Sequence, residues 1–329
     1  MPEKPGNGGY GNEAYDPETG QYVASGGGSK KSSKKISKKF ANLDLLLDDD
    51  EDGEDFGAWI QRRKFWLSEQ PRDPDWVIDN IEQFFDKEVI DYMERWDYHT
   101  SASLSISGKT TYDANRNMTL TNAIALQMYQ PMTPIEPAEF DAMKAEIARR
   151  GELWPSDAKR VPQLYLERGF SGDPRVIEAS YLREQPNDLI LTQGAYGSCV
   201  YTAYNPHTAS SYARRSSVGS SRNGSSGYIM RYILDQSSTK GINYNEAMQL
   251  RNRMRGRAQE AAGRITQHAL KMGIEQSKAE KLGRIFASTI DYDEMFPAVI
   301  CGYDIVYDPG SQYGLLLRFR HVKTRRDWE

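Results

Sequence analysis

Helical patterns come before strand patterns along this chain of 329 residues, and that order is what most limits its possible folds. Apolar residues recur at helical spacing over 74–97, where Asp73 is a good N-cap and Pro74 suits the first turn, and again over 137–150. From Pro162 onward, short β-type runs separated by turns become frequent. Because strands and helices do not alternate regularly as in βαβ repeats, the sequence predicts an α+β protein.

The second half is expected to hold short strands with two helices inserted among them. The predicted strands are 163–166, 188–192, 199–203, 228–234, 298–307 and 313–319. The inserted helices are 243–272, which carries an alanine-rich apolar stripe, and one that begins at a capping box formed by Ser277 and Glu280. In the first half, a further short helix is expected near 120–127.

Residues 1–55 differ in composition from the rest. They carry 7 lysines against 12 carboxylates, so this segment holds all the net acidity of a chain whose formal charge is −4. With few large apolar groups, such a segment cannot bury enough surface to offset its conformational entropy. We therefore expect a disordered charged tail at 1–55 and a single folded domain at 56–329, with a helical lead-in over 56–150 and a β-rich part over 160–329.

The tail admits two interpretations. Six lysines over 29–39 precede eight carboxylates over 44–55, so the segment is either a solvated, self-neutralising tail or an address for a partner. As an address, the lysines would bind a polyanion, or the leucines at 45–47 would dock beside the acids. The segment 16–23 (DPETGQYV) also resembles leader segments of phage-borne proteins.

Several classes of protein are not expected. No apolar run approaches the roughly 20 residues that a membrane helix needs, and the first residues carry neither a secretory nor a transit pattern. Four histidines and two distant cysteines, Cys199 and Cys301, show no metal-ligand spacing, so no metal site is predicted. We expect a protein without membrane contact, located in the host cytoplasm or associated with a virion.

Three motifs recur in order through the β-rich half. Residues 164–170 (LYLERGF) form a strand that ends in Arg-Gly. Residues 196–206 (YGSCVYTAYNP) give a glycine turn and an aromatic strand, and continue into Tyr212 and Ala213. Residues 302–307 (GYDIVY) are followed, after a Pro-Gly turn, by 312–318 (QYGLLLR).

In order and spacing, these motifs resemble those of the ADP-ribosyltransferase superfamily, particularly the transferase-like domains of phage and mobile-element proteins. The resemblance covers about 137–320. It implies a split β-sandwich behind N-terminal helices, with NAD as the substrate and a protein or other macromolecule as the acceptor. The transfer breaks the nicotinamide–ribose bond through an oxocarbenium-like state, as glycoside hydrolysis does.

The resemblance also implies roles for individual residues. Arg168 would hold NAD as a cation, Gly169 would let the backbone approach the nicotinamide amide, and Tyr201 would stack on the ring. Tyr212 matches the aromatic on the following helix. Each has an ordinary alternative as a strand-end cation, a turn residue or a packed aromatic.

Gln312 departs from the family pattern, because it stands where active members carry a glutamate. An amide can bond a ribose hydroxyl but supplies no charge to the developing cation. Three alternatives follow: another carboxylate such as Glu294 or Asp308 serves, the alignment is displaced by a few residues, or the domain binds without transferring.

The sequence leaves two functions and one further partner open. The chain is either a mono-ADP-ribosyltransferase or a non-catalytic virion, structural or interaction protein that retains the fold. Residues 240–284 hold 10 basic and 4 acidic side chains, so the basic helix over 244–272 is a candidate contact for nucleic acid or an acidic partner, or simply an exposed arginine-rich face.

Overall fold

The computed structural model describes residues 14–16, 21–23, 56–68, 70–97, 111–150, 161–170, 174–183, 191–204, 207–210, 213, 228–308 and 313–327. The chain divides into two units, Met1–Gly53 and Glu54–Glu329. In the first, β1 (Ala14–Asp16) pairs antiparallel with β2 (Gln21–Val23), although this segment is predicted to lack structure. The rest of the predicted tail, with its lysine and carboxylate runs, lies outside the described residues.

A mixed sheet organises the second unit, which confirms the α+β prediction. The strand order is β3-β11-β7-β4-β6-β10-β9-β8, and β5 pairs with β6. The strands are β3 (Thr133–Pro134), β4 (Gln163–Phe170), β5 (Thr192–Gly194), β6 (Gly197–Ala203), β7 (Tyr228–Asp235), β8 (Gly241–Asn243), β9 (Ile305–Asp308), β10 (Tyr313–Leu316) and β11 (Val322–Asp327). Only the outer pairs, β3 with β11 and β8 with β9, are parallel among the described strands.

The sheet consists of two halves with a narrow junction. β4 pairs with β7 along its whole length, from Gln163↔Asp235 to Phe170↔Tyr228. Between β4 and β6, by contrast, the register is recorded at one pair of the described residues, Glu167↔Ala203. The half β3-β11-β7-β4 and the half β6-β10-β9-β8 are therefore free to diverge on either side of this pair.

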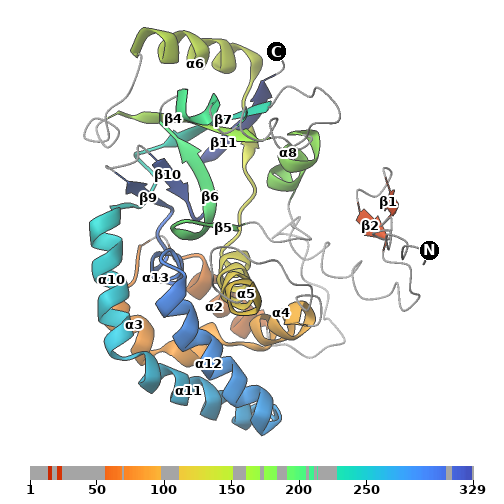
Figure 1. Ribbon diagram of the computed structural model, residues 1–329, viewed down its shortest axis with the longest axis vertical. Coiled ribbons are helices and arrows are strands. Elements are labelled where there is room, and N and C mark those ends of the chain that lie inside the picture. The colour runs from red at the N-terminus through yellow and green to blue at the C-terminus, as the bar shows by residue number, and fades with distance from the viewer. Residues whose placement is uncertain are drawn as a thin grey trace, which may run out of the picture. The chain divides into compact units, whose positions relative to one another are not determined.

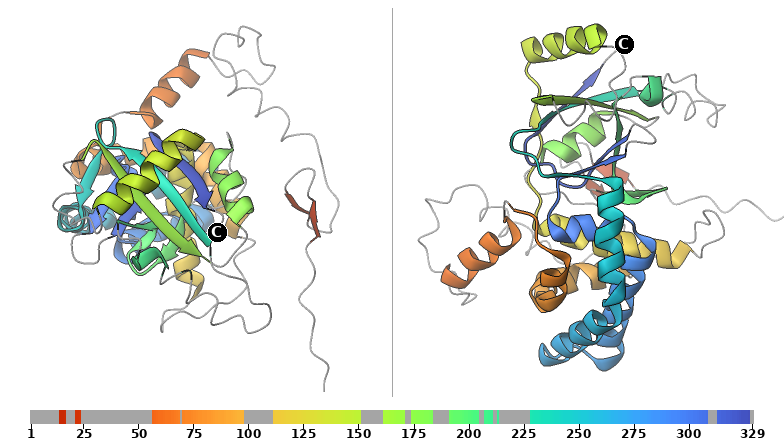
Figure 2. Two further views of the ribbon diagram at one scale, coloured as in Figure 1. Left: turned by 90° about the horizontal axis from the view of Figure 1, so that it is seen from above. Right: turned by 90° about the vertical axis from the view of Figure 1, so that its left-hand side faces the viewer.

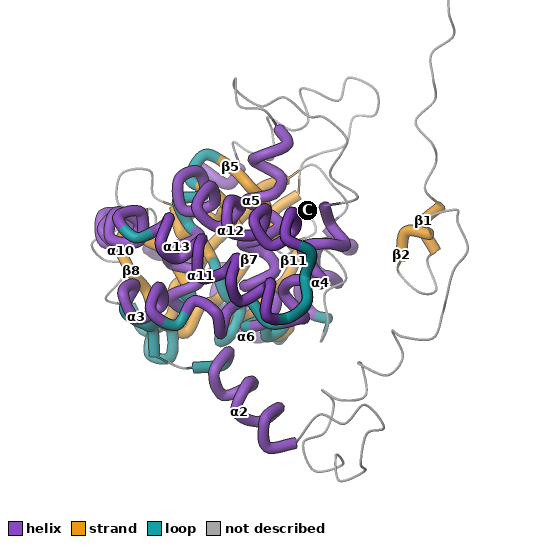
Figure 3. Tube along the Cα trace, turned by 90° about the horizontal axis from the view of Figure 1, so that it is seen from below, coloured by secondary structure: helices purple, strands orange, loops and turns teal. Residues whose placement is uncertain are grey.

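Helices lie on both sides of the strands (Figures 1 and 2). They are α2 (Phe56–Trp66), α3 (Pro74–Asp79), η2 (Ile81–Phe84, a 3₁₀ turn), α4 (Lys87–Asp97), α5 (Thr111–Gln127), α6 (Pro137–Arg150), α8 (Pro174–Leu182), α10 (Tyr244–Gly256), α11 (Ala258–Lys271), α12 (Gln276–Tyr292) and α13 (Phe296–Cys301). Helix α6 covers one face of β7, where Phe140 and Met143 pack on Ile233. Most other helices gather in one layer, which Figure 3 shows from below.

A buried aspartate joins this helical layer to the sheet. Asp293 follows α12 and is fully buried. Its carboxylate accepts hydrogen bonds from the Thr121 hydroxyl on α5 (2.7 Å), the Ser198 N–H on β6 (2.9 Å) and the Met295 N–H (3.1 Å). Gly197 lies so close that a Cβ built on it would stand 2.1 Å from an Asp293 oxygen, and its φ of +108° also favours glycine.

The helix predicted over 74–97 is three segments, α3, η2 and α4. Asn80 ends α3 because its side-chain amide donates to Trp76 O (2.9 Å), which satisfies a carbonyl at the helix end. Asp86 then starts α4 by accepting from the Val89 N–H (2.9 Å). The helix predicted over 243–272 is likewise two helices, which break at Arg257, whereas that over 137–150 is confirmed.

Two other local predictions are wrong. The first half of the strand predicted over 298–307 is helix α13, which starts beside Pro297 and ends at Gly302 in the left-handed region (φ 88°). A short, fully buried apolar run has no period that separates strand from helix, and Pro and Gly at its ends decide. The capping box at Ser277 is also absent, because Glu275 is the N-cap of α12; a capping box forms instead between Asn243 and Glu246 at α10.

Candidate functional site

A continuous row of side chains crosses one face of the sheet. Register partners in neighbouring strands share a face. Following the partners from β9 to β11 gives the cross-sheet row: Asp308, Tyr313, Ala203, Glu167, Arg231 and Arg325. Ala203 is by far the smallest member, and it stands at the junction of the two half-sheets.

A pocket of about 280 Å³ opens beside Ala203. Its walls include Glu167, Gly169, Tyr196, Tyr201, Ala203 and Tyr313, which come from three segments far apart in the sequence. The pocket exists because the small side chain of Ala203 leaves space between two larger neighbours in the cross-sheet row. Its lining is mostly aromatic and aliphatic with few polar groups, as in typical small-ligand sites.

Tyr201 fixes one wall of the pocket. Its hydroxyl accepts from the Tyr196 N–H and donates to Gly197 O, both at 2.9 Å, and so closes the turn between β5 and β6. Its ring lies against Gly194, where a Cβ would stand 2.5 Å from the ring. Burial raises the pKa of Tyr201, so the hydroxyl keeps the proton that it donates.

Tyr196 and Tyr313 extend this aromatic wall. The Tyr196 ring is stacked on Tyr201, with centroids 6.4 Å apart and planes at 29°. The Tyr313 ring meets Tyr196 edge-on, at 6.3 Å and 68°. Sequence reasoning did not single out Tyr196 or Tyr313, although both belong to the quoted motifs, because an aromatic in a turn or at a strand start has no distinctive spacing.

The structure brings Arg168, Gly169 and Tyr201 together at the pocket. The Arg168 guanidinium, however, donates to the Tyr181 hydroxyl on α8 (2.9 Å), and alternation along β4 places it on the opposite face from Glu167. Position 169 requires glycine for a steric reason, because a Cβ there would stand 2.0 Å from Ala209 O. The predicted site residues Tyr212 and Gln312 lie outside the described residues.

Glu167 is the carboxylate that lines the pocket among the described residues. It is 4% exposed, and its Oε1 accepts from Arg231 Nε at 2.7 Å. The Arg231 guanidinium in turn lies 5.7 Å from the ring centroid of Phe140 on α6. The pair is thus oriented, with its carboxylate toward the pocket and its cation toward α6.

The two carboxylates named as substitutes for a missing glutamate lie elsewhere. Glu294 accepts from the Tyr244 hydroxyl (2.6 Å) and pairs with Arg251 (3.4 Å). Asp308 is buried and is the register partner of Tyr313. Neither is part of the pocket wall formed by the described residues. Glu167 was not predicted, because nothing in the strand pattern separates it from an ordinary strand-end charge.

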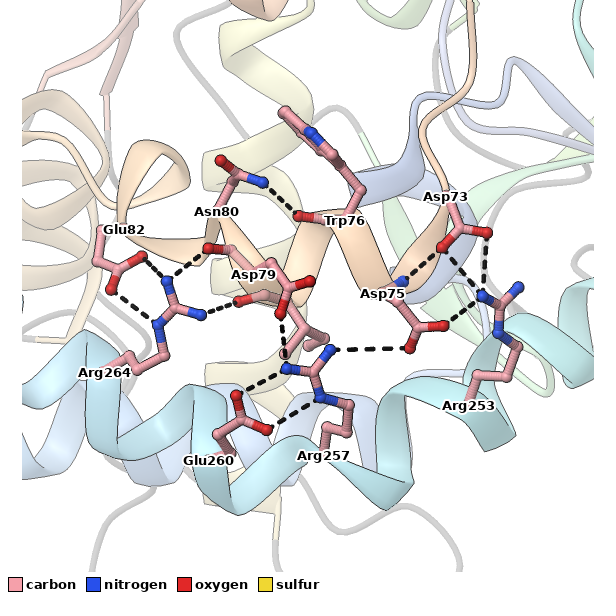
Figure 4. A network of polar contacts seen from close by, with 11 residues as sticks. Asp73, Asp75, Trp76, Asp79, Asn80, Glu82, Arg253, Arg257, Glu260 and Arg264 are labelled. Atoms are coloured by element: carbon pink, nitrogen blue, oxygen red, sulfur yellow. Dashed lines mark hydrogen bonds and ion pairs between the residues drawn. The ribbon is translucent and has the colours of Figure 1, made fainter.

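The basic helices α10 and α11 meet acidic partners within the chain (Figure 4). Arg253 bonds Asp73 (2.9 Å) and Asp75, Arg257 bonds Asp79 (2.6 Å) and Glu260 (2.7 Å), and Arg264 bonds both oxygens of Glu82 (2.8 Å each). Four of these five acids lie on α3, its N-cap and η2. These contacts give the arginines an internal role that needs no external anion.

Comparisons with protein-family models, with curated proteins and with solved structures found no significant match to this chain. Among the described helices, none is long and apolar enough to cross a membrane. No group of three or more His, Cys, Asp or Glu side chains suited to a metal ion occurs in the part of the chain that the structure describes.

Proposed function

We propose that the chain is a mono-ADP-ribosyltransferase-like protein that binds NAD in the pocket beside Ala203. One observation carries the proposal: the three motifs that resemble the superfamily, at 164–170, 196–206 and 312–318, all contribute residues to one pocket. The narrow junction between the half-sheets also fits the split β-sandwich that the resemblance implies.

The chemistry of the pocket suits the nicotinamide end of NAD. Tyrosine rings offer flat faces for the nicotinamide, and the backbone at Gly169 borders the same space. In the transfer, the bond between ribose C1′ and the nicotinamide nitrogen breaks, and its electron pair leaves with nicotinamide. The acceptor's nucleophilic atom then bonds to C1′ and releases its proton to solvent or to a base.

Two measurements test the proposal. Isothermal titration calorimetry of the full chain with NAD is expected to show binding that Tyr196→Ala weakens at least tenfold. Tyr292→Ala is the matched control, because that tyrosine is half exposed and does not line the pocket. Radiolabelled NAD incubated with a cell lysate is expected to label a macromolecule. Absence of both binding and labelling in the wild type contradicts the proposal.

A non-catalytic binding protein is the second candidate, favoured by Gln312 at the position of the family's glutamate. Such a protein binds NAD with the same dependence on Tyr196 but transfers no label. Gln312→Glu separates the candidates: if Gln312 has replaced the catalytic carboxylate, the variant gains transfer while its NAD affinity changes little.

A further inference from the structure

We infer that Glu167 makes the pocket selective for a positively charged ring, and hence for oxidised NAD over its reduced form. The inference rests on the proposed function, because it concerns the same pocket and the same ligand. It assigns a specificity-determining role to a residue outside the five positions that the family pattern marks, which are Arg168, Gly169, Tyr201, Tyr212 and Gln312.

The orientation of the Glu167–Arg231 pair is the first step. Arg231 bonds Glu167 Oε1 and extends toward Phe140, so the cation lies on the α6 side. Among the described residues, Arg231 is the donor to this carboxylate, and it bonds Oε1 and not Oε2, which leaves Oε2 available to a ligand at the pocket wall. An ion pair held in this direction presents its negative end to the pocket, although the pair as a whole is neutral.

The tyrosines of the wall favour the same sign of ligand charge where they present a ring face to the pocket. The faces of the tyrosine rings are negative because of their quadrupole, and they attract cations. The pocket is lined by one cationic residue among those described, Arg168, and its guanidinium is turned to the Tyr181 hydroxyl on the other face of β4. The Glu167 carboxylate and any tyrosine ring face at the pocket thus both attract a positively charged ligand.

The size of the pocket limits which part of a dinucleotide these groups meet. At about 280 Å³ it falls just below the range of roughly 300–1,000 Å³ that is usual for sites enclosing a drug-sized ligand. It therefore suits one end of NAD. Of the two ends, only the oxidised nicotinamide ring carries a positive charge, and this charge is what a pocket of negative sign distinguishes.

Reduction of NAD adds a hydride at C4 of the ring, which removes the positive charge and the aromaticity and leaves the rest of the dinucleotide unchanged. Calorimetry with NAD and NADH on the wild type and on a Glu167 variant therefore isolates the part of the preference that the carboxylate supplies. We expect the wild type to prefer NAD by about tenfold, the order of one charge-assisted contact. Glu167→Gln keeps the shape of the side chain and an acceptor oxygen. We expect it to lose this preference, because its affinity for NAD should fall while its affinity for NADH stays the same.

Two further variants complete the experiment. Glu178→Gln is the matched control, because Glu178 is also a mostly buried carboxylate paired with an arginine of the sheet, Arg326 (3.3 Å), yet it does not line the pocket. It should leave both affinities unchanged. Glu167→Asp keeps the charge and should keep part of the preference, and it serves as the test if Glu167→Gln does not fold.

The outcomes separate the two proposals. If the wild type binds neither dinucleotide, the proposed function fails. If the wild type binds both equally, or if Glu167→Gln weakens NAD and NADH by the same factor, the proposed function stands and the role of Glu167 is wrong. Loss of preference in Glu178→Gln would also contradict it, because the effect would then be a general one of charge.

Discussion

Glu167 on β4 stands opposite Ala203 on β6, and this pair joins the two halves of the sheet. Glu167 is anchored by Arg231 on one side, whereas Ala203 has only a methyl group to place between Glu167 and Tyr313. The junction of the sheet and the floor of the pocket are thus the same two residues, and the size of residue 203 controls the pocket.

Enlarging residue 203 should block the pocket. Ala203→Leu adds three carbon atoms at a position that is 3% exposed and faces the cavity, so we expect NAD binding to be lost. Overpacking of this kind costs about 1–3 kcal/mol, which most folded domains survive. Calorimetry measures binding, and thermal unfolding confirms the fold. Ala203→Ser, which preserves the space, should bind as the wild type does; equal binding by Ala203→Leu would place the ligand elsewhere.

The hydroxyl of Tyr201 should contribute to stability as well as to the site. Tyr201→Phe leaves the Tyr196 N–H and Gly197 O without the partner that bridges them across the β5–β6 turn. We expect the free energy of unfolding in urea to fall by about 1–2 kcal/mol, because the net value of each such bond is near 1 kcal/mol. Tyr165→Phe is the control, since its hydroxyl donates to the side chain of Gln163 in an exposed bond of 3.3 Å that bridges no turn. Equal stability of wild type and Tyr201→Phe would show that the turn closes without this hydroxyl.

The pairing of the α10–α11 arginines predicts weak binding to DNA. A labelled 20-base-pair duplex should show little change in anisotropy with the wild type at low salt, because Arg253 and Arg257 already bond Asp75 and Asp79. The variant Asp75→Asn/Asp79→Asn removes two of the four carboxylates that these arginines bond and leaves Asp73 and Glu260 to pair with them. It should therefore bind more tightly, with an affinity that falls steeply as salt rises. Tight, salt-dependent binding by the wild type that Arg257→Ala weakens would instead support a nucleic-acid partner.

The sequence predicted the elements whose local patterns decide their structure. Helix 137–150, with Pro137 at its start, and the strand 228–234 are near their observed bounds. The sequence-based prediction was wrong where tertiary contacts decide the secondary structure. Residues 298–301 are apolar in every position, and burial between layers, with Pro297 near the start of α13 and Gly302 at its end, makes them helical.

For the site, the sequence named three residues, Arg168, Gly169 and Tyr201, that line one pocket in the structure. Motifs at strand ends made this possible, because the ends of neighbouring strands lie close together at one edge of a sheet. The sequence could not foresee that β4 turns the Arg168 guanidinium toward Tyr181 while Glu167 faces the pocket. That difference depends on which face of the strand is covered, and so on the register with β6 and β7. The acidic partners of Arg253 and Arg264 were equally hidden, since about 180 residues separate them along the chain.

Asp293 should make stability depend on pH in a direction opposite to that of an ordinary salt-bridged acid. Burial raises the pKa of its carboxyl above the usual 3.8, despite the bonds from Ser198 and Thr121 that favour the charged form. The folded state then holds the proton more tightly than the unfolded state. The stabilising contribution is complete below pH 3.8 and is lost as the pH rises through the raised value.

The measurement is the free energy of unfolding of wild type and Asp293→Asn in urea, at intervals from pH 4 to pH 7.5. The asparagine cannot titrate, so the difference, wild type minus variant, should fall as the pH rises, by about 1.4 kcal/mol for each pH unit between the two pKa values. Asp141→Asn, which changes an exposed aspartate on α6, is the control variant measured over the same pH range. A difference for Asp293→Asn that rises with pH would mean that the three hydrogen bonds outweigh burial, and that Asp293 joins the layers as a stabilised anion.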